Sequence, residues 1–257
     1  MTTCQNCQTT FEGKYCPNCA QKADTHRFTL KHFAHDFFHA FTHADKGIFL
    51  LMKELFLKPG KVARDFNAGK RKRYFNPITY LLLIMALQIF LAKKTDVFTV
   101  YLDRTQKMMQ ELRQANQEVS SWNSDEALEA QKKNNPKVLE HNRMLNLIFL
   151  PFLALLTWLF FKKSGFNYAE NLVFNVFYMA QILLFFIIFA IIPFVIFPSG
   201  VMLWMIVYSV IYIAYTFLAL QQFFRQRWWL TLLKGTAVLV IYFILIDQIT
   251  NLVVAYL

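Results

Sequence analysis

The sequence predicts an all-α polytopic membrane protein with about five transmembrane helices, a small N-terminal Cys4 zinc ribbon and cytoplasmic amphipathic helices. Three observations carry this prediction. Of the 257 residues, 56% are hydrophobic and only 17% are charged, so the chain is more apolar and less charged than a soluble domain. The apolar residues gather in runs of the length that crosses a bilayer. All four cysteines lie within the first 19 residues.

Residues 1–24 form the predicted zinc ribbon. Its ligands are two CxxC pairs, Cys4 with Cys7 and Cys16 with Cys19. Two such pairs deliver four thiolates in the tetrahedral arrangement that suits Zn²⁺, and a full set of four ligands indicates a structural rather than a catalytic ion. A head this small builds little core, so the metal supplies much of its folding free energy. Two disulfides or an iron site are the alternatives, and a reducing cytoplasm disfavours the disulfides.

Residues 25–75 are expected to form cytoplasmic or interfacial amphipathic helices followed by a basic hinge. The segment 29–45 has helical spacing, with phenylalanines on one face and histidines on the other. This histidine face is a candidate second metal site or pH sensor. A solvated polar face of a helix that lies on the membrane is the favoured interpretation, because few carboxylates accompany the imidazoles. The histidines are His32, His35, His39 and His43.

The segment 48–57 is strongly apolar but too short to span, and Pro59–Gly60 is expected to end it. Four consecutive basic residues then precede the first span. Such a cluster on the cytoplasmic side attracts anionic lipid head groups, which also sets topology. An anionic ligand, a nucleotide or an oligonucleotide, is the alternative partner. The cluster consists of Lys70, Arg71, Lys72 and Arg73.

Five apolar runs are the predicted transmembrane helices. A Pro–Ser–Gly turn at 198–200 separates the third from the fourth, and Pro193 is expected to kink the third. Residues 93–143 are polar and form a predicted extracytoplasmic helical excursion between the first two spans. The spans are 76–92, 144–161, 172–197, 201–224 and 235–257.

Charge sets the predicted orientation. Residues 1–75 hold 13 Lys and Arg against 6 Asp and Glu, whereas residues 93–143 are nearly neutral. The five basic residues of the remaining chain all fall in the short loops on the N-terminal side of the membrane. The positive-inside rule therefore places the N-terminus in the cytoplasm of a bacterial inner-membrane protein and, with five spans, the C-terminus outside.

Polar side chains inside the spans are candidates for a pore lining or an intramembrane site. Asp247 lies midway in the fifth span and shares a face with Asn251, four residues on. An intramembrane carboxylate is costly, which favours a functional or pore-facing role for Asp247. For the amides of Asn175 and Gln181 in the third span, hydrogen bonds between helices are the favoured interpretation.

Several motifs together resemble the DUF3667 family of bacterial membrane proteins, mostly from Bacteroidota. They are the head CQNCQTTFEGKYCPNCAQ, the stretch KPGKVARDF at 58–66 and the stretch GKRKRYFNP at 69–77. The resemblance covers residues 1–92 and implies a zinc-ribbon head, a basic segment and a multi-span tail, with no assigned activity. Zinc ribbons often carry glycine directly after each pair, where this chain has Gln8 and Ala20; the family usually has glycine in place of Ala20.

The function expected from these features is that of a non-enzymatic integral membrane protein with a cytoplasmic zinc-ribbon head that senses or docks a partner. No Ser-His-Asp set, glycine-rich phosphate loop or HExxH motif is present. We expect lipid, a second copy of the chain in a homo-oligomer, and an anionic ligand or cytoplasmic protein at the head as partners. A ligand-gated pore or channel-type effector, with Asp247 and the span amides along its path, is the first alternative. A transporter or membrane enzyme is the second.

Overall fold

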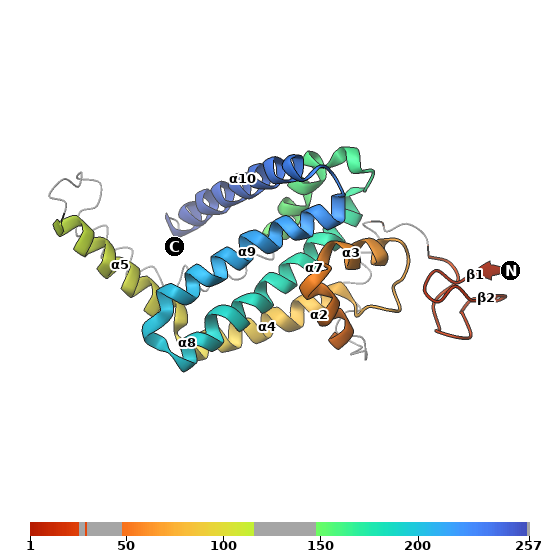
Figure 1. Cartoon of the computed structure of the whole chain (residues 1–257), viewed down its shortest axis with the longest axis horizontal. Coiled ribbons are helices and arrows are strands. Elements are labelled where there is room, and N and C mark those ends of the chain that lie inside the picture. The colour runs from red at the N-terminus through yellow and green to blue at the C-terminus, as the bar shows by residue number, and fades with distance from the viewer. Residues whose placement is uncertain (26–28, 30–47, 116–147, 256–257) are drawn as a thin grey trace. The chain divides into compact units, whose positions relative to one another are not determined.

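The computed structural model describes residues 1–25, 29, 48–115 and 148–255 (Figure 1). These residues divide into two compact units. The first comprises Met1–Ala86, Leu150–Leu183 and Ile213–Tyr242, and the second comprises Leu87–Phe149, Leu184–Tyr212 and Phe243–Leu257. The predicted histidine helix at 29–45 falls, apart from residue 29, outside the described residues.

The head is a small loop-rich module with a two-stranded antiparallel sheet. Strand β1 (Thr2–Thr3) pairs with β2 (Thr10–Phe11), with Thr2 opposite Phe11. A single bridge between Tyr15 and Lys22 closes the second half of the head. Such short strands have little intrinsic stability, so the head depends on what its cysteines hold together.

Two helices follow the head in the first unit. Helix α2 (Ile48–Leu57) ends where Pro59–Gly60 was expected to end it. Helix α3 (Pro59–Asn67) starts directly afterwards, with Pro59 in its first turn, where a proline loses no helical hydrogen bond. Helix α3 was not predicted from the sequence, although this helix buries Val62, Ala63 and Phe66 at helical spacing.

The first candidate span is α4 (Pro77–Thr95), close to the predicted 76–92. Its start follows from the Asn-Pro pair. The Asn76 side-chain oxygen accepts hydrogen bonds from the amides of Ile78 (2.9 Å) and Thr79 (3.2 Å), and Pro77 takes the first helical position. Lys93 and Lys94 lie in the last turn, where positive charge favours a helix end.

The third predicted span corresponds to α7 (Tyr168–Phe186), a π-helical turn η2 (Ile187–Ile191) and α8 (Ile192–Ile196). The π turn comes just before Pro193, which has no amide hydrogen to donate to Phe189. The Ile192 amide instead bonds the Ile187 carbonyl, five residues back. Pro193 therefore perturbs the helix as expected, by a widened turn.

The remaining spans form a hairpin followed by a long last helix. The turn η3 (Pro198–Gly200) joins α8 to α9 (Val201–Phe224), as the Pro–Ser–Gly sequence predicts. Helix α10 (Trp228–Ala255) begins seven residues before the predicted 235–257. Side chains such as Leu203, Ile213, Leu233 and Phe243 are exposed on these helices, as expected of surfaces that meet lipid.

Among the described residues, four helices are long and apolar enough to cross a membrane: Pro77–Thr95, Tyr168–Ile196, Pro198–Phe224 and Trp228–Ile249. The chain is thus a mostly helical membrane protein. The predicted span 144–161 appears as a shorter apolar helix, Ile148–Phe160. Its predicted first four residues lie outside the described part of the chain, so the second predicted span, 144–161, stays a prediction.

Stacked phenylalanines form part of the core of the first unit. Phe223 stacks on Phe174 with ring centroids 4.3 Å apart and on Phe166 at 4.4 Å. Phe224 stacks on Phe161 at 4.0 Å. These rings join the start of α7 to the end of α9 through large apolar contact areas.

In the second unit, the predicted excursion 93–143 is described as far as residue 115. That part is the helix α5 (Val97–Ala115). The Arg104 guanidinium donates a 3.0 Å hydrogen bond to the Ser199 carbonyl, so α5 is tied to the η3 turn. The rest of the excursion is outside the described residues.

Candidate metal centre

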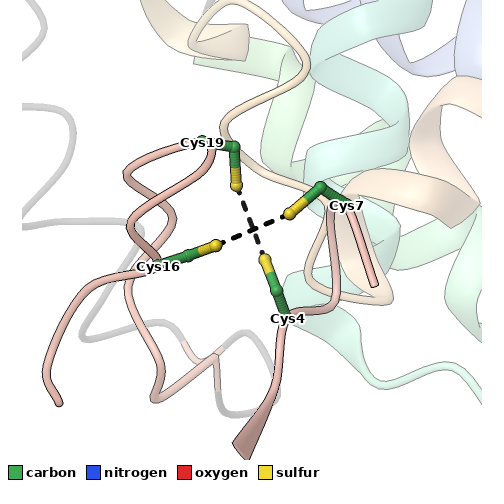
Figure 2. Close-up of side chains that lie close together, drawn as sticks. All are labelled: Cys4, Cys7, Cys16 and Cys19. Atoms are coloured by element: carbon green, nitrogen blue, oxygen red, sulfur yellow. Dashed lines mark hydrogen bonds between the residues drawn. The ribbon is translucent and has the colours of Figure 1, made fainter. Parts of the chain in front are cut away.

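Each CxxC pair sits in the same backbone turn. In the first, the Cys4 amide bonds the Thr9 carbonyl and the Gln8 amide bonds the Cys4 carbonyl. In the second, the Cys16 amide bonds the Gln21 carbonyl and the Ala20 amide bonds the Cys16 carbonyl. The repeat of this pattern presents all four thiols to one point (Figure 2).

The four sulfur atoms are close enough to share one ion. The Sγ atoms of Cys4 and Cys19 are 3.5 Å apart, as are those of Cys7 and Cys16, and all four lie within 4.8 Å of one another. A tetrahedral zinc site with Zn–S bonds of about 2.3 Å has sulfurs roughly 3.8 Å apart. The donor set and its spacing therefore fit a tetrahedral metal ion, as the sequence predicted.

The backbone explains the glycine preference after each pair. Gln8 and Ala20 adopt φ angles of 63° and 57°, in the left-handed region where a side chain is unfavourable. Both positions are the turn residues that follow a cysteine pair. The two turns form with non-glycine residues at a conformational cost, and no ligand is displaced.

The cysteines are also most of the core of the head. Cys4, Phe11 and Cys16 are buried together, with Cys7, Cys19 and Ala23 packed against them. Hydrogen bonds with the Thr9 side chain and backbone lower the pKa of the Cys7 thiol to about 6, whereas burial raises that of Cys16 to about 11. Metal binding must therefore release protons from this cluster.

Gln21 connects the head to the basic hinge loop, which we define as residues 68–76. Its side-chain nitrogen donates to the Gly69 carbonyl at 3.0 Å, and its side-chain oxygen accepts from the Lys72 amide at 2.9 Å. Gln21 is 4% exposed, and its own carbonyl accepts the Cys16 amide. One residue thus closes a cysteine turn and holds the loop that leads into α4.

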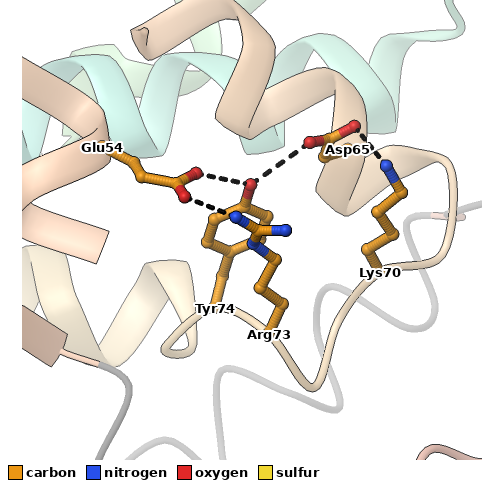
Figure 3. Close-up of polar contacts among 5 residues, drawn as sticks. All are labelled: Glu54, Asp65, Lys70, Arg73 and Tyr74. Atoms are coloured by element: carbon orange, nitrogen blue, oxygen red, sulfur yellow. Dashed lines mark hydrogen bonds and ion pairs between the residues drawn. The ribbon is translucent and has the colours of Figure 1, made fainter. Parts of the chain in front are cut away.

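The basic hinge loop is also joined to α2 and α3 by a polar cluster (Figure 3). Arg73 pairs with Glu54 at 2.6 Å, and the Tyr74 hydroxyl donates to Glu54 at 2.8 Å and to Asp65 at 3.2 Å. Lys70 pairs with Asp65 at 2.9 Å. We call Glu54, Asp65, Lys70, Arg73 and Tyr74 the hinge cluster.

Two of the four predicted lipid-binding or ligand-binding basic residues, Lys70 and Arg73, are therefore engaged within the chain. Lys72 is exposed, and Arg71 is partly buried. Sequence reasoning missed the partners Gln21, Glu54 and Asp65. Nothing in the sequence marks Gln21, but a lone carboxylate in the apolar segment 48–57 was a usable signal for Glu54.

The polar residues predicted to line a pore lie in different surroundings. The Asn175 amide donates to the Thr157 hydroxyl at 2.9 Å, and Gln181 accepts from the Tyr80 hydroxyl at 3.0 Å. Both amides are buried and bridge helices of the first unit, which agrees with the packing role favoured for them. Asp247 is on the exposed side of α10, and the side chain of Asn251 lies outside the described residues. The pore lining stays a prediction.

Part of the chain matches a known protein family. Residues 45–89 match DUF3667, described as a protein of unknown function. This match confirms the resemblance to the family over residues 45–89, and the DUF3667 segment runs from just before α2 through most of α4. It contains every member of the hinge cluster, whereas the cysteine head precedes it. No curated protein and no solved structure matches the chain.

Proposed function

We propose that this chain is a non-enzymatic membrane protein whose head binds a structural Zn²⁺ and, in that form, holds the basic hinge loop of the DUF3667 segment. Four thiolates at tetrahedral spacing favour zinc, because soft sulfur donors in this geometry select it over hard cations. The single observation that carries the proposal is the pair of hydrogen bonds in which the Gln21 side chain donates to the Gly69 carbonyl and accepts from the Lys72 amide.

The proposed chain of effects is short. Metal binding orders the second cysteine turn, which Gln21 closes with its backbone. The ordered Gln21 side chain then fixes the loop between α3 and α4. Tyr74 and Arg73, three and four residues before Pro77, bind that loop to Glu54 on α2. Loss of metal would therefore loosen the entrance to the first span, which is the property expected of a sensing or docking head.

Basic residues of the first unit support a cytoplasmic position for the head. Lys162 and Lys163 lie in the turn η1 (Lys162–Ser164), Arg225 and Arg227 lie between α9 and α10, and Lys234 lies near the start of α10. The basic hinge loop lies directly before the start of α4. The positive-inside rule assigns the end of a span that carries such loops to the cytoplasm.

Metal analysis tests the first step of this proposal. We expect about one zinc per chain in protein purified in detergent without added metal, and loss of most of it in Cys4→Ser and Cys16→Ser. Thr3→Ser, a change on β1 next to the site, is the matched control and should retain the zinc. Full zinc content in both cysteine variants, or iron in place of zinc, would refute the proposed centre.

A further inference from the structure

Helix α2 presents two different faces. Leu51 and Leu55 are fully buried against the first unit. On the opposite side Phe49 is 79% exposed and Leu57 72% exposed, with Leu50 and Lys53 beside them. We call these four residues the α2 outer face. Large apolar side chains gathered on one helix face indicate a surface that is covered in the native environment.

The depth at which α2 is held shows what covers it. The Tyr215 hydroxyl donates a 2.9 Å hydrogen bond to the Leu55 carbonyl. Tyr215 lies nine residues before Phe224, the end of α9, or about 13 Å along the helix. Helical side chains lean towards the N-terminus, here still farther from that end. The candidate span Pro198–Phe224 has 27 residues and reaches about 40 Å, as thick as a bilayer with its head groups.

A second set of contacts gives the same depth on another span. Helix α3, which directly follows α2, places Phe66 against Phe177 with ring centroids 5.5 Å apart. Phe177 lies nine residues, again about 13 Å, from the start of α7 at Tyr168. The head-group layer on each side of a bilayer is only about 5–8 Å thick. Leu55 and Phe66 therefore lie at the border of the acyl chains, whereas Leu57 and Gly60 contact Gln222 and Phe223 at the end of α9, in the head-group layer.

The charges of α2 are compatible with that border. Glu54 is paired with Arg73 and bonded by Tyr74, so its carboxylate is neutralised within the chain. Lys53 is exposed in the middle of the outer face, between Phe49 and Leu57. A lysine at this depth can extend its long stem along apolar surroundings and keep its ammonium group among phosphates.

We propose that α2 is a membrane-embedded helix that does not span, and that its outer face binds the lipids of one leaflet. Phe49 and Leu50 contact acyl chains, Leu57 lies in the head-group layer, and Lys53 reaches the head-group phosphates. This assigns a lipid contact to the DUF3667 segment in addition to α4, and it makes α2 and α4 two separate attachments of that segment to the bilayer.

Photo-crosslinking in a bilayer tests the proposal. A benzophenone amino acid replaces Phe49 or Leu57 in the full chain, reconstituted into vesicles of phosphatidylethanolamine and phosphatidylglycerol. Two sites with equal exposure serve as controls, each 62% exposed: Ile213 on the candidate span α9 and Tyr15 on the head. After illumination, mass spectrometry reads which molecule each site has captured. Unchanged zinc content and monodispersity show that each variant has folded.

We expect phospholipid adducts at position 49 at yields comparable to those at 213, and on the order of tenfold above those at 15, because only a site at acyl-chain depth meets hydrocarbon continuously. Position 57, at the head-group end of α2, should give adducts at a yield between those at 49 and 15. Adduct yields at 49 and 57 equal to those at 15 would overturn the proposal. Crosslinks from these positions to a second copy of the chain in place of lipid would overturn it as well and assign the outer face to an oligomer contact.

Discussion

The side-chain amide of Gln21 binds Gly69 and Lys72 at once, accepting from the Lys72 amide at 2.9 Å and donating to the Gly69 carbonyl at 3.0 Å. This link joins two segments 48 residues apart that otherwise have unrelated chemistry: a cysteine head and a basic loop. It also couples the metal centre to the basic hinge loop, because the same residue closes the second cysteine turn.

Replacement of Gln21 separates metal binding from hinge order. Gln21→Ala leaves the four thiols in place but removes one buried and one partly buried hydrogen bond, a loss of about 1–3 kcal/mol in the docking of the loop. We expect normal zinc content and faster amide hydrogen exchange at residues 69–76. Lys22→Ala alters the next, exposed side chain and is the control. Unchanged exchange in Gln21→Ala would show that the hydrogen bonds of Gln21 do not stabilise the basic hinge loop.

Glycine should improve the turn that follows the second cysteine pair. Ala20 holds a φ of 57°, where a side chain costs about 1–2 kcal/mol. Glycine would relieve this strain, but its greater freedom in the unfolded chain offsets part of the stabilisation. We expect Ala20→Gly to slow the removal of zinc by a chelator, consistent with a net gain of about 0.5–1 kcal/mol. Lys14→Gly, at an ordinary backbone position, should speed zinc removal or leave it unchanged. Faster zinc loss from Ala20→Gly would contradict the assignment of strain to this turn.

The hinge cluster should make stability depend on pH through Glu54. Burial raises the pKa of this carboxyl, but the hydrogen bonds from Arg73 and Tyr74 outweigh it, so the pKa in the folded state is below its ordinary value of 4.5. A lowered folded pKa gives a stabilisation that is complete above the ordinary pKa and is lost as the pH falls through the folded value.

Glu54→Gln should therefore cost about 1 kcal/mol at neutral pH and progressively less in acid. Thermal unfolding of the two proteins over a pH series measures the difference. Glu12→Gln, which alters an exposed carboxylate on the head, should show no such convergence. A constant difference between Glu54→Gln and the parent at every pH would rule out the ion pair as its cause.

Gly60 lies directly against the backbone of α9 at Gln222 and Phe223. A Cβ at this position would collide with the backbone of Gln222 and Phe223, which cannot yield as a flexible side chain does. We expect Gly60→Ala to displace α3 and to destabilise the protein by about 1–3 kcal/mol, seen as a lower melting temperature in detergent. Lys61→Ala, at the exposed neighbour, should have little effect. An unchanged melting temperature for Gly60→Ala would mean that α3 does not pack on α9 this closely.

The features that sequence could predict were those with a local signal. The CxxC spacing predicted the thiol cluster, the Asn-Pro pair marks the start of α4, and Pro198–Gly200 marked the hairpin turn. Apolar runs predicted the spans, although α10 begins seven residues early, because Lys234 interrupts the apolar sequence between Trp228 and the predicted start at Gly235.

What sequence could not predict depends on contacts between distant residues. The roles of Gln21 and Glu54 arise only when α2, α3 and the head are brought to the basic hinge loop, and nothing local marks a glutamine for such a role. For the same reason Lys70 and Arg73 were predicted to bind lipid head groups or, alternatively, an anionic ligand, whereas their carboxylate partners lie five and 19 residues away. The histidine face lies outside the described residues and stays a prediction.

Hydrogen exchange of the basic hinge loop, measured with and without metal, tests the central claim most directly. The full chain is reconstituted in lipid nanodiscs, and exchange is followed by mass spectrometry in the zinc-bound state and after chelation. The proposed linkage predicts that residues 69–76 lose protection on chelation together with residues 4–21, while α7 is unchanged, and that zinc restores it. Loss of protection confined to residues 4–21 would contradict the claim that the metal state of the head controls the hinge.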